Sequence, residues 1–185
     1  INFGEKSFGF NSGYLTSYEL QCSIGQIPRS SARFQVYGDV GSGIDAEGST
    51  PHPSIEIPNQ GSITLSTTGY ENNRITDFNY SLEVERSPVY KIGSPHPVQV
   101  DIKTPTTEKI SISMDINDHE VVRLHEYLIK PRQQTVNLVL KNPISKSVID
   151  TFTLSKARLV SNSISASSEG IMTASLNYEC YTNTK

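Results

Sequence analysis

Histidine and cysteine carry the most reactive chemistry available to this sequence, which has four of the first and two of the second. His119-Glu120 and His125-Glu126 have the residue types of a helical zinc site. Two zinc ligands on one helix face must be four residues apart, whereas these histidines are six apart and point to different sides. We therefore expect solvent-facing polar residues here and no metal site.

The other reactive groups do not form a catalytic arrangement. Glycines recur in residues 38–43, but no Lys-Ser or Lys-Thr follows them, as a phosphate-binding loop would require. Glu83 and Glu85 share one face of an expected strand and are explained more simply as its solvent-exposed side. Cys22 and Cys180 would pair only in an oxidising compartment, and we expect two free, partly buried thiols. The sequence thus predicts no catalytic residue, no cofactor and no enzyme.

Two histidines are each flanked by prolines, His52 within residues 51–53 and His96 within residues 95–97. Flanking prolines fix φ on both sides and hold the imidazole outward on a rigid turn. Such a histidine is either a contact residue at an interface or part of a plain turn. The sequence leaves both interpretations open.

The composition narrows the class of protein. The 185 residues contain 16 Lys and Arg against 19 Asp and Glu, a net charge of −3, together with 25 Ser and 15 Thr. This charge does not suit a nucleic-acid binder that must neutralise a run of phosphates. No apolar run approaches the ~20 residues that span a bilayer, and the regular recurrence of hydrophobic residues argues against disorder. We therefore expect a soluble β protein with a polar surface.

Apolar and polar residues alternate along most of the chain, which gives each strand one apolar and one polar face. Turn residues (Gly, Pro, Asn and Ser) separate the runs. The alternating runs and the turns between them predict an all-β fold, an antiparallel β-barrel or sandwich, in a single domain spanning residues 1–185. The runs are 32–36, 63–65, 78–84, 98–102, 110–116, 136–140 and 174–180.

One segment has helical periodicity instead. Val121, Leu124 and Leu128 fall at i, i+3 and i+7, which predicts a short helix over residues 118–128. Asn117 followed three residues later by Glu120 is the pattern of a capping box. We expect this helix to lie against the β core.

Two stretches without periodicity are predicted to be long loops, at 38–53 and 87–97. Loops of this length in a compact domain are uncommon and tend to be functional or disordered. The first is the better candidate for an arm that orders on contact with a partner.

The C-terminal third resembles a known family. Residues 151–160 lead through the Ser- and Gly-rich segment 161–170 into residues 171–180, where small hydroxyl and apolar residues alternate. This pattern resembles the closing hairpin of tail tube proteins of tailed bacteriophages. Residues 17–28 look like phage virion proteins of the same broad kind, and one helix between mid-chain strands matches the tube fold. The longer stretch up to Pro53 leaves a baseplate-proximal or adaptor component open.

The resemblance implies a structural virion protein of the phage tail, assembled in the host cytoplasm. Its copies would form stacked rings, expected to be hexameric, through which DNA passes without sequence-specific binding. Its other partners would be tail proteins such as the sheath, tape measure, baseplate or terminator, and no membrane. We expect the two loops to supply the contacts between subunits, through Gly41, Ser42, Gly43, Ile44, Asp45, His52, Tyr90 and His96.

A second class stays open, a non-catalytic β-sandwich module that decorates a capsid or binds a host-surface carbohydrate. Sugar-binding sites usually present exposed aromatic side chains, often Trp. This chain has no Trp but nine Tyr, so the composition does not exclude that function. The assembly state separates the two classes.

Overall fold

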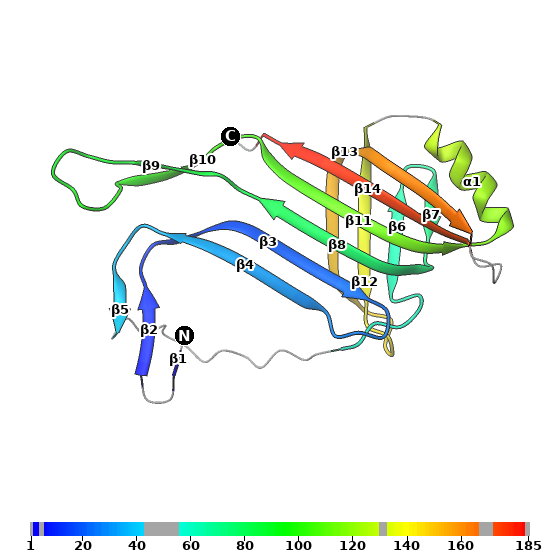
Figure 1. Ribbon diagram of the computed structural model, residues 1–185, viewed down its shortest axis with the longest axis horizontal. Coiled ribbons are helices and arrows are strands. Elements are labelled where there is room, and N and C mark those ends of the chain that lie inside the picture. Colours follow the sequence, from blue (N-terminus) through cyan, green and yellow to red (C-terminus); the bar gives the residue numbers. More distant parts are fainter. Residues whose placement is uncertain (1, 4–5, 43–55, 130–132, 167–171, 184–185) are drawn as a thin grey trace.

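The computed structural model describes residues 2–3, 6–42, 56–129, 133–166 and 172–183. In these ranges the chain is mostly antiparallel β-structure with one α-helix, which confirms the predicted fold class (Figure 1). The elements are β1 (Asn2–Phe3), β2 (Lys6–Phe10), β3 (Gly13–Ser23), β4 (Arg29–Val36), β5 (Val40–Ser42), β6 (Ile63–Thr67), β7 (Tyr70–Asn72), β8 (Ile75–Glu83), β9 (Arg86–Val89), β10 (Gln99–Ile102), β11 (Thr106–Ile116), α1 (Asp118–Leu128), β12 (Gln134–Lys141), β13 (Val148–Ala166) and β14 (Met172–Thr182).

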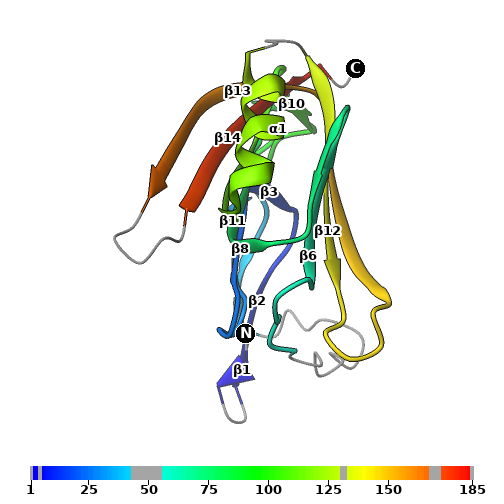
Figure 2. The same ribbon diagram turned by 90° about the vertical axis from the view of Figure 1, so that its right-hand side faces the viewer.

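The largest sheet has the strand order β4-β3-β8-β11-β14-β13-β12-β6-β7. It folds over at β13, which pairs with β12 through its first half and with β14 through its second half. We call β4, β3, β8, β11, β14 and residues 158–166 of β13 the wide layer, and residues 148–157 of β13, β12, β6 and β7 the narrow layer. Figure 2 shows the two layers facing each other, with α1 at the near end.

Two irregularities let β13 pass from one layer to the other. Against β12, the register has an extra residue between Leu154 and Ala157, and Lys156 there has a φ of 58°. Against β14, Val160 is the extra residue between Leu159 and Ser161. Bulges bend a strand and increase its twist, so two of them close together form the corner of the sandwich.

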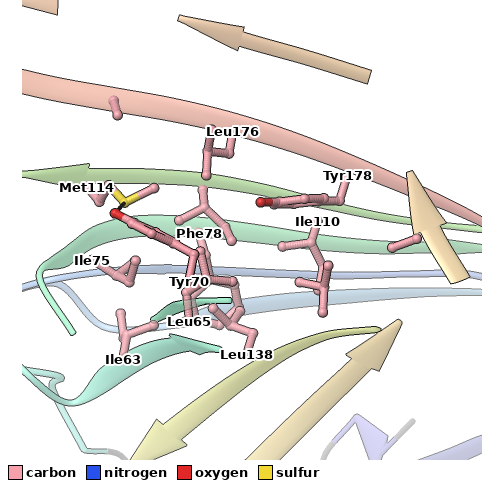
Figure 3. Packing of buried hydrophobic residues seen from close by; sticks show 14 of the residues in the cluster. Ile63, Leu65, Tyr70, Ile75, Phe78, Ile110, Met114, Leu138, Leu176 and Tyr178 are labelled. Carbon is pink, nitrogen blue, oxygen red and sulfur yellow. Dashed lines mark hydrogen bonds between the residues drawn. The ribbon is translucent and has the colours of Figure 1, made fainter. Parts of the chain in front are cut away.

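The core lies between the layers and comes from the predicted alternation (Figure 3). Every second residue of β11 and β14 points into it, so that Ile112 of β11 lies opposite Leu176 of β14. The large side chains with almost no exposed surface include Phe78, Ile110, Ile112, Met114, Leu176 and Tyr178 from the wide layer and Ile63, Leu65, Leu138 and Leu154 from the narrow layer.

The helix α1 has the predicted bounds and the predicted cap. The Asn117 side chain accepts from the Glu120 amide at 2.9 Å, and the Glu120 carboxylate accepts from the Asn117 amide at 3.1 Å. Leu124 is fully buried in the core, and Val121 and Leu128 pack against it. In the described ranges, no helix is long and apolar enough to cross a membrane.

A group of buried tyrosines fastens α1 to both layers. The Tyr127 hydroxyl of α1 lies 2.8 Å from the Tyr178 hydroxyl of β14 and accepts from the Gln134 amide of β12. Its ring stacks on Tyr70 of β7 with centroids 5.4 Å apart. Burial raises the pKa of Tyr178 far above its ordinary value, so this hydroxyl stays protonated and can donate.

Two strands predicted from alternation lie outside the core. In β4, Ala32 and Phe34 are exposed, and in β10 the same holds for Ile102. Strand β10 pairs only with β9 among the described strands, and the two form a hairpin that extends beyond the layers (Figure 1). Part of the loop predicted at 87–97 is therefore strand, since residues 87–89 belong to β9.

Candidate assembly surfaces

One face of the wide layer packs on the core, and the other is polar over most of the layer, with Tyr181 of β14 as an exposed aromatic side chain on it. Cross-strand rows of small hydroxyl, amide and charged residues run across it. One row is Ser31, Glu19, Ser81, Lys109, Glu179 and Arg158, and the next is Arg29, Gln21, Asn79, Ser111, Asn177 and Ser161. The register places the acidic and the serine residues of these strands on the same face.

The side chains of this polar face are largely bonded to one another. Asn79 donates to Glu19 at 2.7 Å, and Asn177 donates to Ser161 at 2.8 Å. Farther along the strands, Ser165 and Thr173 share a hydrogen bond of 2.8 Å. Such cross-strand polar pairs stabilise the sheet and leave few groups that must seek an external partner.

Several cations of the polar face lie close to carboxylates. Lys109 is 3.4 Å from Glu179, and Arg158 is the register partner of the same glutamate on the other side. Arg33 and Glu83 flank Ser17 in a parallel row. Because these positive charges are dispersed among acidic residues of the same face, such as Glu19, Glu83 and Glu179, its described residues form no cluster of cations that would hold a phosphate backbone.

The wide layer ends in two open edges. Among the described residues, β4 pairs only with β3, and the half of β13 beyond the corner pairs only with β14. The described strands of this layer number six and all neighbours are antiparallel, so β4 and β13 run in opposite directions. Unpaired strand edges are templates for pairing with another chain.

Large apolar side chains mark both edges. Phe34 of β4 is 54% exposed and Ile164 of β13 is 42% exposed. Their register partners, Leu15 and the buried Ala174, place both on the core side of the layer, beyond the cover of the narrow layer. Each edge therefore presents an apolar residue that a neighbouring strand would cover.

The residues predicted as contacts are only partly brought together. His96 and Asp39 lie 3.4 Å apart, and the His96 ring is 3.0 Å from the Tyr37 carbonyl, so this histidine ties the β9–β10 turn to the chain after β4. Tyr90 is exposed near the same turn. Gly41 and Ser42 belong to β5, which pairs with β2. Gly43, Ile44, Asp45 and His52 lie outside the described residues.

A polar pocket of about 590 Å³ lies where the wide layer meets the root of the β9–β10 hairpin. Charged side chains of both signs line it, among them Arg33, Glu83 and Arg86. Arg86 donates to the Leu15 carbonyl at 3.0 Å and lies over the Tyr14 ring, so it is occupied in fastening the hairpin. We therefore interpret the pocket as the place where the hairpin is attached to the wide layer, not as a ligand site.

The residue types with catalytic or metal-binding chemistry are dispersed. Within the described part of the chain, no group of His, Cys, Asp and Glu is arranged to hold a metal ion. Cys22 and Cys180 are buried and unpaired by any disulfide, as expected. Burial raises the pKa of the Cys22 thiol to about 11, and the nearby Asp77 carboxylate adds to the shift. This thiol is therefore protonated and unreactive at neutral pH.

Sequence reasoning missed Phe34 and Ile164 as candidate contacts. Their alternation was visible, but period two shows which residues share a face and not whether another layer covers that face. No protein-family model matches the chain, and a search of curated proteins finds no matching relative.

Proposed function

We propose that this chain is a structural virion protein whose copies form rings that stack into a phage tail tube. The observation that carries the proposal is the wide layer, with its two open, antiparallel edges and its largely polar face. The resemblance of residues 151–180 to tail tube proteins points to the same function. Neither feature requires catalysis.

The ring follows from the direction of the strands. A rotation about an axis parallel to the strands keeps the direction of each strand. It therefore brings β4 of one copy beside β13 of the next in antiparallel orientation. Repetition of this heterologous contact closes a ring. The layers of all copies then form one continuous barrel of antiparallel strands.

The polar face lines the channel in this arrangement. The narrow layer packs on the other face of the wide layer, so it lies on the outside of the ring (Figure 2). The channel wall is then formed by hydroxyl, amide and balanced charged residues. DNA can slide along such a wall, because phosphate binding requires unbalanced Lys and Arg.

Single lysine substitutions on the two edges test the proposal. We expect wild-type protein to form six-fold rings or hollow tubes in negative-stain electron microscopy. Phe34→Lys and Ile164→Lys should each give folded monomers of 20.4 kDa by light scattering. The contact between β4 of one copy and β13 of the next would otherwise bury the charge of the new lysine. The matched control is Ile144→Lys, at a 91% exposed site in the β12–β13 turn, which should still form rings.

Two results would contradict the proposal. One is a wild-type protein that remains monomeric at high concentration, and the other is normal rings from both edge variants. A stable monomer would favour the alternative, a decoration or carbohydrate-binding module. Glycan and capsid binding would then be the next measurements.

A further inference from the structure

The β9–β10 hairpin extends the wide layer along its strand direction. Strand β9 follows β8 after two residues, and β10 leads into β11 after three, so the hairpin continues the two central strands past the layer (Figure 1). Residues 86–92 span about 20 Å at about 3.3 Å per residue. In a ring whose strands follow the tube axis, this hairpin projects beyond the ring.

The root of the hairpin is held in place. Arg86 bonds to the Leu15 carbonyl and lies over Tyr14, and Lys103 pairs with Glu85 at 3.3 Å. The contact of His96 with Asp39 fixes the other side of the turn. The hairpin therefore projects in a defined direction.

One face of the hairpin is apolar and uncovered. Register and alternation place Tyr90, Val98 and Ile102 on this face, and all three are exposed. Ile92 at the tip is completely exposed. An isolated two-stranded hairpin is at best marginally stable in water, so this face favours a partner that covers it.

The opposite end of the layer has a surface of matching chemistry. There α1 exposes Val122, and its C-cap residue Ile129, which keeps helical backbone angles, is exposed seven residues later, so the two lie on one stripe with Glu126 between them. On the hairpin, Lys91 lies between Tyr90 and Ile92 in the sequence, at the turn beyond the end of β9, where strand alternation no longer fixes the side-chain direction. Among the described residues neither Lys91 nor Glu126 has an ion-pair partner.

We propose that the β9–β10 hairpin of one copy docks on the exposed stripe of α1 in a second copy, in the next ring of the stack. The apolar hairpin residues cover Val122 and Ile129, and Lys91 pairs with Glu126. The two surfaces lie at opposite ends of the folded molecule (Figure 1). The contact is therefore heterologous and repeats without closing, as stacking requires. This inference rests on the proposed function and names the contact that turns rings into tubes.

A charge exchange tests the contact. Lys91 and Glu126 are both exposed, so Lys91→Glu and Glu126→Lys should leave folding and ring formation unchanged. Each single variant places like charges opposite each other, and the amount of protein in sedimentable tubes should fall at least tenfold. The double variant restores opposite charges and should recover tubes. The matched control Lys146→Glu changes the same charge in the distant β12–β13 turn and should stack as the wild type does.

A second substitution tests the apolar part of the contact. Ile92→Ser removes a fully exposed side chain, so it should leave thermal unfolding unchanged and give separate rings in electron micrographs. The inference is overturned if the wild type forms tubes and both charge variants form them equally well, or if the double variant fails to recover. Absence of rings from the wild type would instead overturn the proposed function.

Discussion

At the scale of single residues, β14 shows how alternation fixes the two faces of a strand. Leu176 has no exposed surface and lies between Ile112 and Asn162 in the register, whereas its neighbour Ser175 lies on the polar face. Ser175 is 3.4 Å from the Ser113 hydroxyl across the strands. We therefore expect a charged side chain to be tolerated at Ser175 and not at Leu176.

We predict that Leu176→Asp unfolds the subunit. The substitution places an unpaired carboxylate in the core and removes a leucine, which together should cost more than about 4 kcal/mol. Circular dichroism during thermal and urea unfolding measures the effect. The neighbouring Ser175→Asp should shift stability by less than about 1 kcal/mol. A soluble Leu176→Asp variant that unfolds cooperatively would show that the faces of β14 are the reverse of those described.

At the scale of elements, the corner of β13 depends on the backbone of Lys156. Its φ of 58° is unfavourable for residues with a side chain and worst for β-branched ones. We predict that Lys156→Val destabilises the protein by about 1–2 kcal/mol, and that Lys156→Gly is within about 1 kcal/mol of the wild type. Urea unfolding midpoints compare the three proteins. Equal stability of the Val and Gly variants would mean that the corner does not require this conformation.

The elements differ in how well the sequence predicts them. Helix α1 was predictable because Asn117 and Glu120 form a local capping pair and the apolar residues recur with helical spacing. The paired strands β11 and β14 were predictable because both have strict alternation. The corner in β13 was not, because its two bulges shift the alternation within one strand.

The candidate contacts were less predictable than the fold. Phe34 and the β9–β10 hairpin have the same period-two pattern as core strands, and only the tertiary arrangement leaves them outside the core, with Phe34 touching the Phe10 ring of β2 and otherwise exposed. Lys91 and Glu126 are ordinary surface charges in the sequence. They become a candidate pair only because the fold places the hairpin and α1 at opposite ends of one layer. Assembly surfaces of this kind depend on long-range geometry that local patterns do not carry.

At the scale of the whole molecule, the polar face of the wide layer is the surface on which the proposed function depends. Glu179 lies between Lys109 and Arg158 and so balances two cations of the proposed channel wall. Removing this carboxylate would leave two neighbouring positive charges without their common partner. The proposed channel wall would then attract phosphates.

We therefore predict that Glu179→Gln gives the protein an affinity for DNA that the wild type lacks. Fluorescence anisotropy with a short duplex at low and physiological salt measures it. If Lys109 and Arg158 then each contact a phosphate, the logarithm of the affinity should fall with the logarithm of the salt concentration with a slope of about −2. The control Glu71→Gln changes an exposed carboxylate of the narrow layer, which lies outside the channel, and should not bind. Equal binding by both variants would mean that net charge, rather than the polar face, keeps DNA free to move.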